Sequence, residues 1–338
     1  MGEVFSEVDL DYFRINSPVF GELAWEIEVF LVRHFEYGNY SFRSALRGFY
    51  GELLRSVFYV CRSGGRIVGV AGGLYSRFNP TFAVLGPVCV AADYRRRGIG
   101  SELVNRLLNC FYYQGCRWIY LGISGESGAE KFYEGLGFAR YSGIVMRKRL
   151  FSEERYQASF TVKGSLSVRR MEWEDFCGVS VLMVEPAEIM SFDFEGGIFS
   201  TRYFEAERFL GVFPAMMERF GKYGGFGNVL FSSEVGTVVG VSHIKRFVSG
   251  PQRHLGVFDF FVHDDFVEKS IELVEKTVRE AEGFSVEELI CYCPVADGVK
   301  QGILLSTCFK KRERLEGFLR IGGKSMAVDV YRYEFSSQ

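Results

Sequence analysis

The chain has 338 residues, a formal net charge of −2 and 48% hydrophobic residues, which suits two domains of ordinary size and excludes a globally basic nucleic-acid-binding surface. No stretch approaches the roughly 20 apolar residues of a membrane span, and the acidic start "MGEVFSEVDLDYF" is unlike a secretory signal. The eight cysteines include no CxxC pair, which argues against a disulfide framework or a zinc site. We therefore expect a cytoplasmic protein with no metal, no membrane contact and no nucleic-acid partner.

The predicted elements occur twice along the chain. Residues 64–76, "GGRIVGVAGGLYS", alternate like a buried strand after a glycine turn, and residues 235–247, "VGTVVGVSHIKRF", repeat the pattern 171 residues later. Three further pairs of segments recur in the same order at offsets of 170 to 172 residues: 90–94 with 262–266, 102–104 with 272–274, and 136–138 with 307–309. Because all four pairs share nearly one spacing, they indicate a duplicated domain.

Each copy has the pattern of an α/β domain with a mixed α+β sheet. The order is a first strand with helices, a hairpin, a strongly apolar strand, a helix, another strand, a helix and closing strands. We expect domains at 1–150 and 165–338, joined by a polar linker at 151–164.

A loop rich in arginine and glycine separates a predicted strand from a predicted helix in the first copy. Residues 82–92 form an apolar, β-leaning run, and residues 101–115 carry leucines at helical spacing before a glycine stop. The loop "RRRGIG" therefore lies at a helix N-terminus, where unbonded amides and the helix dipole attract anions. Gly98 and Gly100 allow close approach to the backbone, so a pyrophosphate would fit.

Two better-known phosphate loops do not match this one. A nucleoside triphosphate loop ends in GK[ST], and a dinucleotide fingerprint begins with glycine directly after the strand. The loop instead fits the pattern [Q/R]-x-x-G-x-[G/A]. A second pattern, A-x-x-[LF]-Y-x-x-x-G-F, follows within residues 118–150 at Ala129, Phe132, Tyr133, Gly137 and Phe138. With both motifs in this order, the first copy resembles the GNAT family of N-acetyltransferases.

The resemblance implies acetyl-CoA as cosubstrate and a primary amine, of a small molecule or a protein, as acceptor. It implies that loop amides hold the pyrophosphate, that the pantetheine lies beside the apolar strand, that the amine attacks the thioester directly, and that Tyr133 is the general acid. The residues expected at the cofactor are Val88, Cys89, Val90, Arg95, Arg96, Arg97, Gly98, Ile99, Gly100, Ser101, Glu126, Ala129 and Phe132. Tyr133 as a merely packed aromatic is the alternative. For Cys89 we expect a buried, inert thiol rather than a nucleophile.

The general base is left open by the sequence. Glu126 stands where the family often has asparagine, and it could cap a helix or accept a proton. His34 and Glu36 fall near the family's acceptor cleft, although an isolated histidine beside aromatic residues is more often structural.

The second copy lacks the features of the first site. Its loop "FVEKS" has no glycine or arginine and carries Glu268, and Leu304 stands at the position of Tyr133. We expect a degenerate GNAT-like domain that walls the acceptor cleft, forms a homodimer or binds the acceptor. The alternative for the whole chain is an acyl-CoA-binding regulatory protein whose second domain contacts a partner, but the retained Tyr133 favours turnover.

Overall fold

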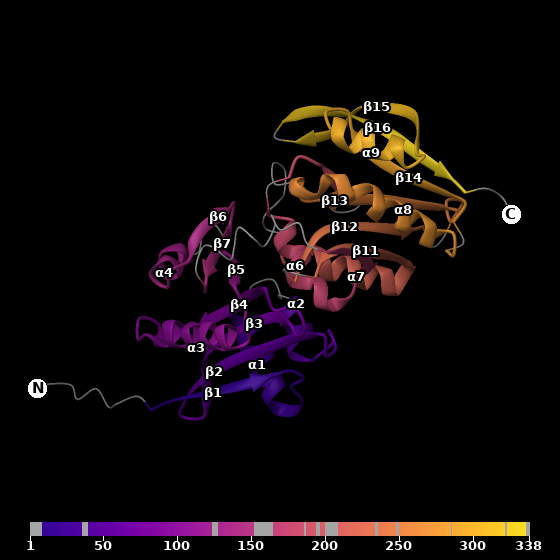
Figure 1. Cartoon of the computed structure of the whole chain (residues 1–338). Helices are drawn as coiled ribbons and strands as arrows, with labels where there is room; N and C mark the ends of the chain where they lie inside the picture. The colour runs from indigo at the N-terminus through magenta and orange to yellow at the C-terminus, as the bar shows by residue number, and fades with distance from the viewer. Residues whose placement is uncertain are drawn as a thin grey trace, which may run out of the picture. The chain divides into compact units, whose positions relative to one another are not determined.

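Two seven-stranded sheets, one in each half of the chain, organise the computed structural model (Figure 1). The two units are Met1–Ser152 and Glu153–Gln338. The structure describes residues 9–35, 40–123, 128–151, 165–185, 187–193, 197–199, 209–233, 236–247, 250–284, 286–321 and 323–335. None of the helices in these ranges is long and apolar enough to cross a bilayer.

The first unit is a mixed sheet with helices. Its elements in chain order are β1 (Leu10–Asn16), α1 (Gly21–His34), α2 (Tyr40–Leu46), β2 (Leu54–Ser63), β3 (Arg66–Ser76), β4 (Phe82–Val90), a 3-10 turn (Ala92–Tyr94), α3 (Ile99–Tyr113), β5 (Trp118–Gly122), α4 (Ala129–Gly135), β6 (Ala139–Ser142) and β7 (Val145–Arg149). The strand order is β1-β2-β3-β4-β5-β7-β6. Only β4 and β5 pair in parallel, and the other neighbours are antiparallel.

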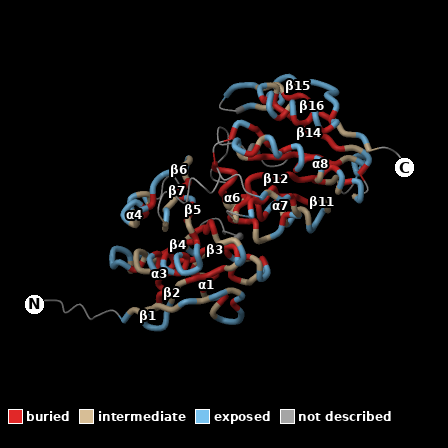
Figure 2. The backbone as a smooth tube through the Cα atoms, viewed as in Figure 1, coloured by how far each residue is buried: buried red, intermediate tan, exposed pale blue. Residues whose placement is uncertain are grey.

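Glycine in β3 lets α3 lie directly on the sheet. A Cβ added at Gly69 would come 2.9 Å from side-chain atoms of both Ile99 and Leu103 on α3. Nearly every residue of β3 is buried, on both faces of the strand, and α1 also packs against β3 and β4. Figure 2 shows the central strands of this unit as buried backbone. The sheet is therefore covered on both faces, and its core positions β4 and the start of α3.

The second unit has the same plan. Its elements are β8 (Leu166–Arg170), a 3-10 turn (Trp173–Asp175), α6 (Phe176–Leu182), β9 (Ser191–Asp193), β10 (Gly197–Phe199), α7 (Val212–Tyr223), β11 (Gly225–Ser232), β12 (Thr237–Arg246), β13 (Leu255–Val262), a 3-10 helix (Asp264–Lys269), α8 (Ser270–Ala281), β14 (Glu288–Pro294), α9 (Gly298–Ser306), β15 (Lys310–Ile321) and β16 (Lys324–Glu334). The sheet runs β8-β11-β12-β13-β14-β16-β15, and β9 pairs with β10 separately.

The two sheets match strand for strand. Read from β1 and from β8, the orders are identical, and in each the one parallel pair is the fourth strand with the fifth, β4 with β5 and β13 with β14. Gly240 on β12 repeats the role of Gly69, because a Cβ there would come 3.3 Å from Leu273 on α8. The predicted fold class, two tandem α+β domains each with a GNAT-like mixed sheet, is confirmed.

One local difference separates the fourth strands. The pairing of β3 with β4 shifts register between Ala71 and Gly73, so Ala71 faces Val88 while Gly73 faces Leu85. The extra residue of β4 is thus accommodated around Gly86, whose φ is 145°. In the second unit β12 pairs with β13 without a shift, and a single residue, Asp259, occupies the corresponding place.

Candidate functional site

The site of the first unit begins where β4 and β5 part. The parallel pairing joins only Phe82–Val84 to Trp118–Tyr120, although β4 continues to Val90. The amide of Ala91 donates to the carbonyl of Val68 on β3. Since backbone groups alternate in direction along a strand, the N–H and C=O of Val90 face away from β3, toward the split. The carbonyl of Val90 accepts a 3.1 Å hydrogen bond from Nε of Arg95.

The turn after β4 leads into α3 through a left-handed glycine. Gly98 has φ 79° and precedes Ile99, the first residue of α3, and the first helical hydrogen bond runs from the amide of Glu102 to the carbonyl of Gly98. The helix therefore begins two residues before the predicted start at Ser101, because glycine adopts this conformation without steric cost. The amides of Ile99, Gly100 and Ser101 precede the first helical bond, so they can bind an anion.

The three arginines of the turn differ in orientation. Arg95 folds back to Val90, as described above, and Arg97 lies over the ring of Tyr94 with its guanidinium carbon 5.2 Å from the ring centroid. Arg96 has a left-handed backbone with φ 63°. Arg95 and Arg96 line the cavity beside the turn, whereas Arg97 is not among its lining residues.

A cavity of about 500 Å³ joins the turn, the end of β4 and α4. All the residues predicted at the cofactor line it except Arg97 and Glu126, and Glu126 lies outside the described residues. The lining residues are His34, Phe35, Val88, Cys89, Val90, Tyr94, Arg95, Arg96, Gly98, Ile99, Gly100, Ser101, Ala129, Phe132 and Tyr133. Phe35 and Tyr94 were not predicted for the site, and His34 was considered only for the acceptor cleft.

Tyr133 comes to the cavity from α4. Its side chain is 8% exposed, and its ring meets those of Phe132 and Phe138 edge-on, at centroid distances of 4.9 and 5.7 Å. Burial raises the pKa of the phenol above its ordinary value. Tyr133 therefore keeps its proton throughout the physiological range and can donate it in a hydrogen bond within the cavity.

Cys89 also lines the cavity, as a protonated thiol rather than a nucleophilic thiolate. Burial raises the pKa of its thiol to about 11, against a smaller lowering by Arg95. A thiol needs to be a thiolate to attack, and at neutral pH this one is protonated.

Comparison with known proteins assigns this part of the chain. Residues 55–140 match the acetyltransferase (GNAT) domain family. The first unit contains a GNAT acetyltransferase domain. Members of this family use acetyl-CoA, and the match spans the turn after β4, α3, β5 and α4. The resemblance inferred from the two motifs is thereby confirmed for the first half of the chain.

Several solved structures are similar to about half of the chain at low identity. A GNAT-family acetyltransferase from Streptococcus pneumoniae is 15% identical, with 51% of this chain and 100% of that chain covered and a TM-score of 0.40. A ribosomal-protein-alanine N-acetyltransferase from Brucella melitensis is 14% identical, with coverages of 50% and 99% and a TM-score of 0.41. A Salmonella typhimurium protein solved with its cofactor acetyl-CoA is 13% identical, with coverages of 52% and 96% and a TM-score of 0.41.

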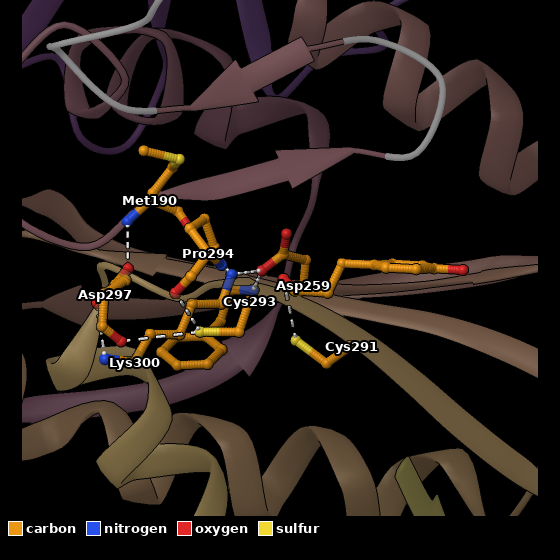
Figure 3. Close-up of polar contacts among 9 residues, drawn as sticks. Met190, Asp259, Cys291, Cys293, Pro294, Asp297 and Lys300 are labelled. Carbon is orange, nitrogen blue, oxygen red and sulfur yellow. Dashed lines mark hydrogen bonds and ion pairs between the residues drawn. The ribbon is translucent and has the colours of Figure 1, made fainter. Parts of the chain in front are cut away.

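The second unit has a buried ionic cluster at the corresponding split. There β13 pairs with β14 only over Leu255–Val257, so the two strands part before Asp259. Lys300, on α9, is fully buried and stands 171 residues after the cavity-lining Ala129. Its Nζ lies 2.5 Å from Oδ1 of Asp259 on β13, and Figure 3 shows this pair at the centre of the cluster.

A short backbone segment completes that cluster. Nζ of Lys300 also donates to the carbonyl of Met190 at 2.9 Å, and the amide of Met190 donates to Oδ2 of Asp297 at 2.7 Å (Figure 3). Asp297 in turn caps α9 by accepting from the amide of Lys300. Although burial alone would lower the pKa of Lys300, the nearby carboxylate of Asp259 raises it above its ordinary value, so the lysine stays charged.

The second unit also differs from the first at the turn before the helix and at the position of Tyr133. The 3-10 helix Asp264–Lys269 runs directly into α8, without the left-handed glycine that precedes α3. Leu304 occupies the place of Tyr133. The carbonyl of Tyr133 accepts a 3.0 Å hydrogen bond from the amide of Phe138, and the carbonyl of Leu304 accepts the same bond, also 3.0 Å, from the amide of Phe309. Neither the left-handed glycine of the turn nor the phenol of the first unit has a counterpart at these positions.

Proposed function

We propose that the first unit is an acetyl-CoA-dependent N-acetyltransferase, which transfers acetyl to the primary amine of a small molecule or a protein. One observation carries this proposal: a single cavity in a GNAT domain joins the helix-start amides, the open edge of β4 and the buried phenol of Tyr133. The proposed domains are a catalytic one at 1–150, a linker at 151–164 and a degenerate one at 165–338.

The residues at the turn suit the pyrophosphate of CoA. The amides of Ile99, Gly100 and Ser101 provide donors at the positive end of α3, and Arg96 adds charge beside them. A Cβ at Gly100 would make ordinary van der Waals contact, at 3.4 Å, with the ring of Phe132, so Gly100 and Phe132 lie close together on the cavity wall. Along β4, the backbone groups of Val88 and Val90 would bond the pantetheine as a neighbouring strand would.

Acetyl-CoA would supply the acetyl group as an activated thioester. The amide of Val90, directed into the split, would stabilise the negative charge that develops on the acyl oxygen. The phenol of Tyr133 would hydrogen-bond the departing sulfur and deliver a proton to it. Cys89 has a raised pKa and carries no charge for attack, which supports direct transfer to the amine rather than an acetyl-enzyme route.

The second unit is proposed to bind no acyl-CoA. In the second unit the charged pair of Lys300 and Asp259 fills the split between the fourth and fifth strands. In the first unit the pantetheine of CoA would lie in the equivalent split, beside Ala129 and the open edge of β4. Its role in walling the acceptor cleft, forming a homodimer or binding the acceptor stays a prediction.

Amine-dependent release of CoA thiol tests the proposal. The intact chain is incubated with acetyl-CoA and a panel of alkylamines, polyamines, amino acids, aminoglycosides and lysine peptides, and the acetylated product is identified by mass spectrometry. Turnover of at least one amine, weakened in Tyr133→Phe, supports the proposal. Tight acetyl-CoA binding without turnover of any amine would favour the regulatory alternative.

A further inference from the structure

His34 brings a titratable nitrogen to the same cavity as Tyr133. It is the last residue of α1. His34 and Phe35 are the lining residues that precede β4 in the chain. The ring lies 4.5 Å, between centroids, from that of Phe30, one helical turn earlier. Among the described residues that line this cavity, His34 is the one histidine.

One hydrogen bond determines the tautomer of His34. Nδ1 lies 2.7 Å from the backbone carbonyl oxygen of Phe30. A carbonyl oxygen only accepts, so Nδ1 must carry the hydrogen. In the neutral ring the lone pair is then on Nε2, and the ring orientation is held by the bond at Nδ1, as in other histidines that act as bases.

We propose that His34 is the general base of the acetyl transfer, accepting through Nε2 a proton from the incoming ammonium. This inference rests on the proposed N-acetyltransferase function. An alkylammonium with a pKa near 10.4 is free amine in only roughly one molecule in 10³ at pH 7, so a base beside it raises the rate. Proton removal by His34 converts a cationic acceptor into a nucleophile in this cavity.

The proton balance of the step closes with the groups in the cavity. The ammonium gives one proton to Nε2, and the nitrogen lone pair then forms the C–N bond while the C–S bond breaks. The second proton lost by the nitrogen balances the one that Tyr133 gives to the departing sulfur. His34 returns its proton to solvent, so the products are the amide, the free CoA thiol and one proton in solution.

Cationic and neutral side chains share the described cavity wall with His34. The titratable or charged residues on the cavity wall are Cys89 of β4, Tyr94, Arg95 and Arg96 of the turn, and Tyr133 of α4. Cys89 and Tyr133 are neutral because their pKa values are raised, while the two arginines are cationic. No carboxylate is among the described lining residues, and Glu36 and Glu126 lie outside the described part of the chain. Nε2 is the nitrogen that the bond to Phe30 leaves without a hydrogen in the neutral ring.

Two acceptors of similar size separate proton removal from binding. Ethylamine is an ammonium at pH 7, whereas 2,2,2-trifluoroethylamine is largely free base. We expect His34→Gln to lower kcat/KM by about 10²-fold for ethylamine, or for the best acceptor of the amine panel, and by less than about fivefold for the fluorinated amine. Binding of acetyl-CoA by calorimetry should be unchanged. His254→Gln, at an exposed position of the second unit, is the matched control.

Chemical rescue gives the second readout. In His34→Ala, kcat/KM for ethylamine should fall as in His34→Gln and return in part with added imidazole. Equal losses for both amines, or no rescue by imidazole, would overturn the assignment of the base while leaving the acetyltransferase intact. Wild-type protein that binds acetyl-CoA and acetylates no amine would remove the proposed function and the base with it.

Discussion

Lys300 and Asp259 form a fully buried ion pair in the second unit, with exposures of 0% and 2%. The pair lies where β13 and β14 part, and in the first unit the equivalent parting opens into a cavity lined by Ala129. Nζ of Lys300 lies 5.4 Å from the ring centroid of Phe260, which adds a cation–π contact to its bonds with Asp259 and Met190. The same fold thus holds an open split in one copy and a filled one in the other.

Removing one member of this pair should destabilise the second unit strongly. Lys300→Met leaves the carboxylate of Asp259 buried without its counter-ion, so we expect a loss of about 3–5 kcal/mol in the free energy of unfolding. The double variant Asp259→Asn, Lys300→Met removes both charges and should lose much less. Hydrogen exchange of β13 and α9 peptides in increasing urea measures both. Equal losses in the single and double variants would show that the charge pairing is not what matters.

The second unit should lose stability as the pH falls from 6.5 to 4. Burial lowers the pKa of His243 on β12 to about 4, whereas in the unfolded chain it is about 6.5. Between these values the unfolded state binds a proton that the folded state does not, so stability falls on acidification by up to about 3 kcal/mol. Urea midpoints against pH test this. His243→Gln should flatten the curve, and the exposed His254→Gln should not.

Tyr133→Phe should lower kcat by about 10²-fold while leaving the dissociation constant of acetyl-CoA within about twofold. The ring keeps its edge-on contacts with Phe132 and Phe138, and only the hydroxyl is lost. Steady-state kinetics and calorimetry on the same sample separate the two constants. A variant with unchanged kcat would leave Tyr133 as a packed aromatic, the alternative that its sequence context also allowed.

Cys89→Ala should keep most of the turnover, because a protonated thiol in this cavity does not form a thioester. Intact-mass spectrometry of the wild type with acetyl-CoA and no amine should show no acetylated protein. Acetyl on Cys89, together with loss of activity in Cys89→Ala, would establish a two-step route instead.

The repeat and the turn could be predicted from sequence because each depends on local patterns. Gly69 and Gly240 mark the strands on which α3 and α8 rest, and the spacing of the paired segments predicted two copies of one domain, in agreement with the matching strand orders of the two sheets. The predicted start of α3 at Ser101 is two residues late. The spacing of apolar residues does not detect the left-handed Gly98, which ends the preceding turn.

The remaining features depend on contacts that sequence spacing does not reveal. Asp259 and Lys300 are 41 residues apart, and charged residues are ordinarily expected at the surface. The stacking of Arg97 on Tyr94 removes one of three apparently equivalent arginines from the cavity wall. The hydrogen of His34 is assigned to Nδ1 only through the bond to Phe30, which no motif encodes.

Arg96→Glu and Arg97→Glu form a matched pair in the turn. Both change the net charge equally, but only Arg96 lines the cavity. We expect Arg96→Glu to weaken acetyl-CoA binding by about tenfold or more and Arg97→Glu to weaken it by less than about threefold. Similar losses in both at 0.5 M salt, where long-range charge effects are screened, would mean that the orientation of the arginines is unimportant.

Calorimetric titration of the intact chain with acetyl-CoA is the most direct test of the account. One site per chain is predicted, and Gly98→Asp should abolish it, because the added carboxylate would lie beside the helix-start amides and the left-handed backbone of Gly98, with φ 79°, disfavours any side chain. No binding to the wild type, or two equivalent sites per chain, would contradict a single acyl-CoA site in the first unit.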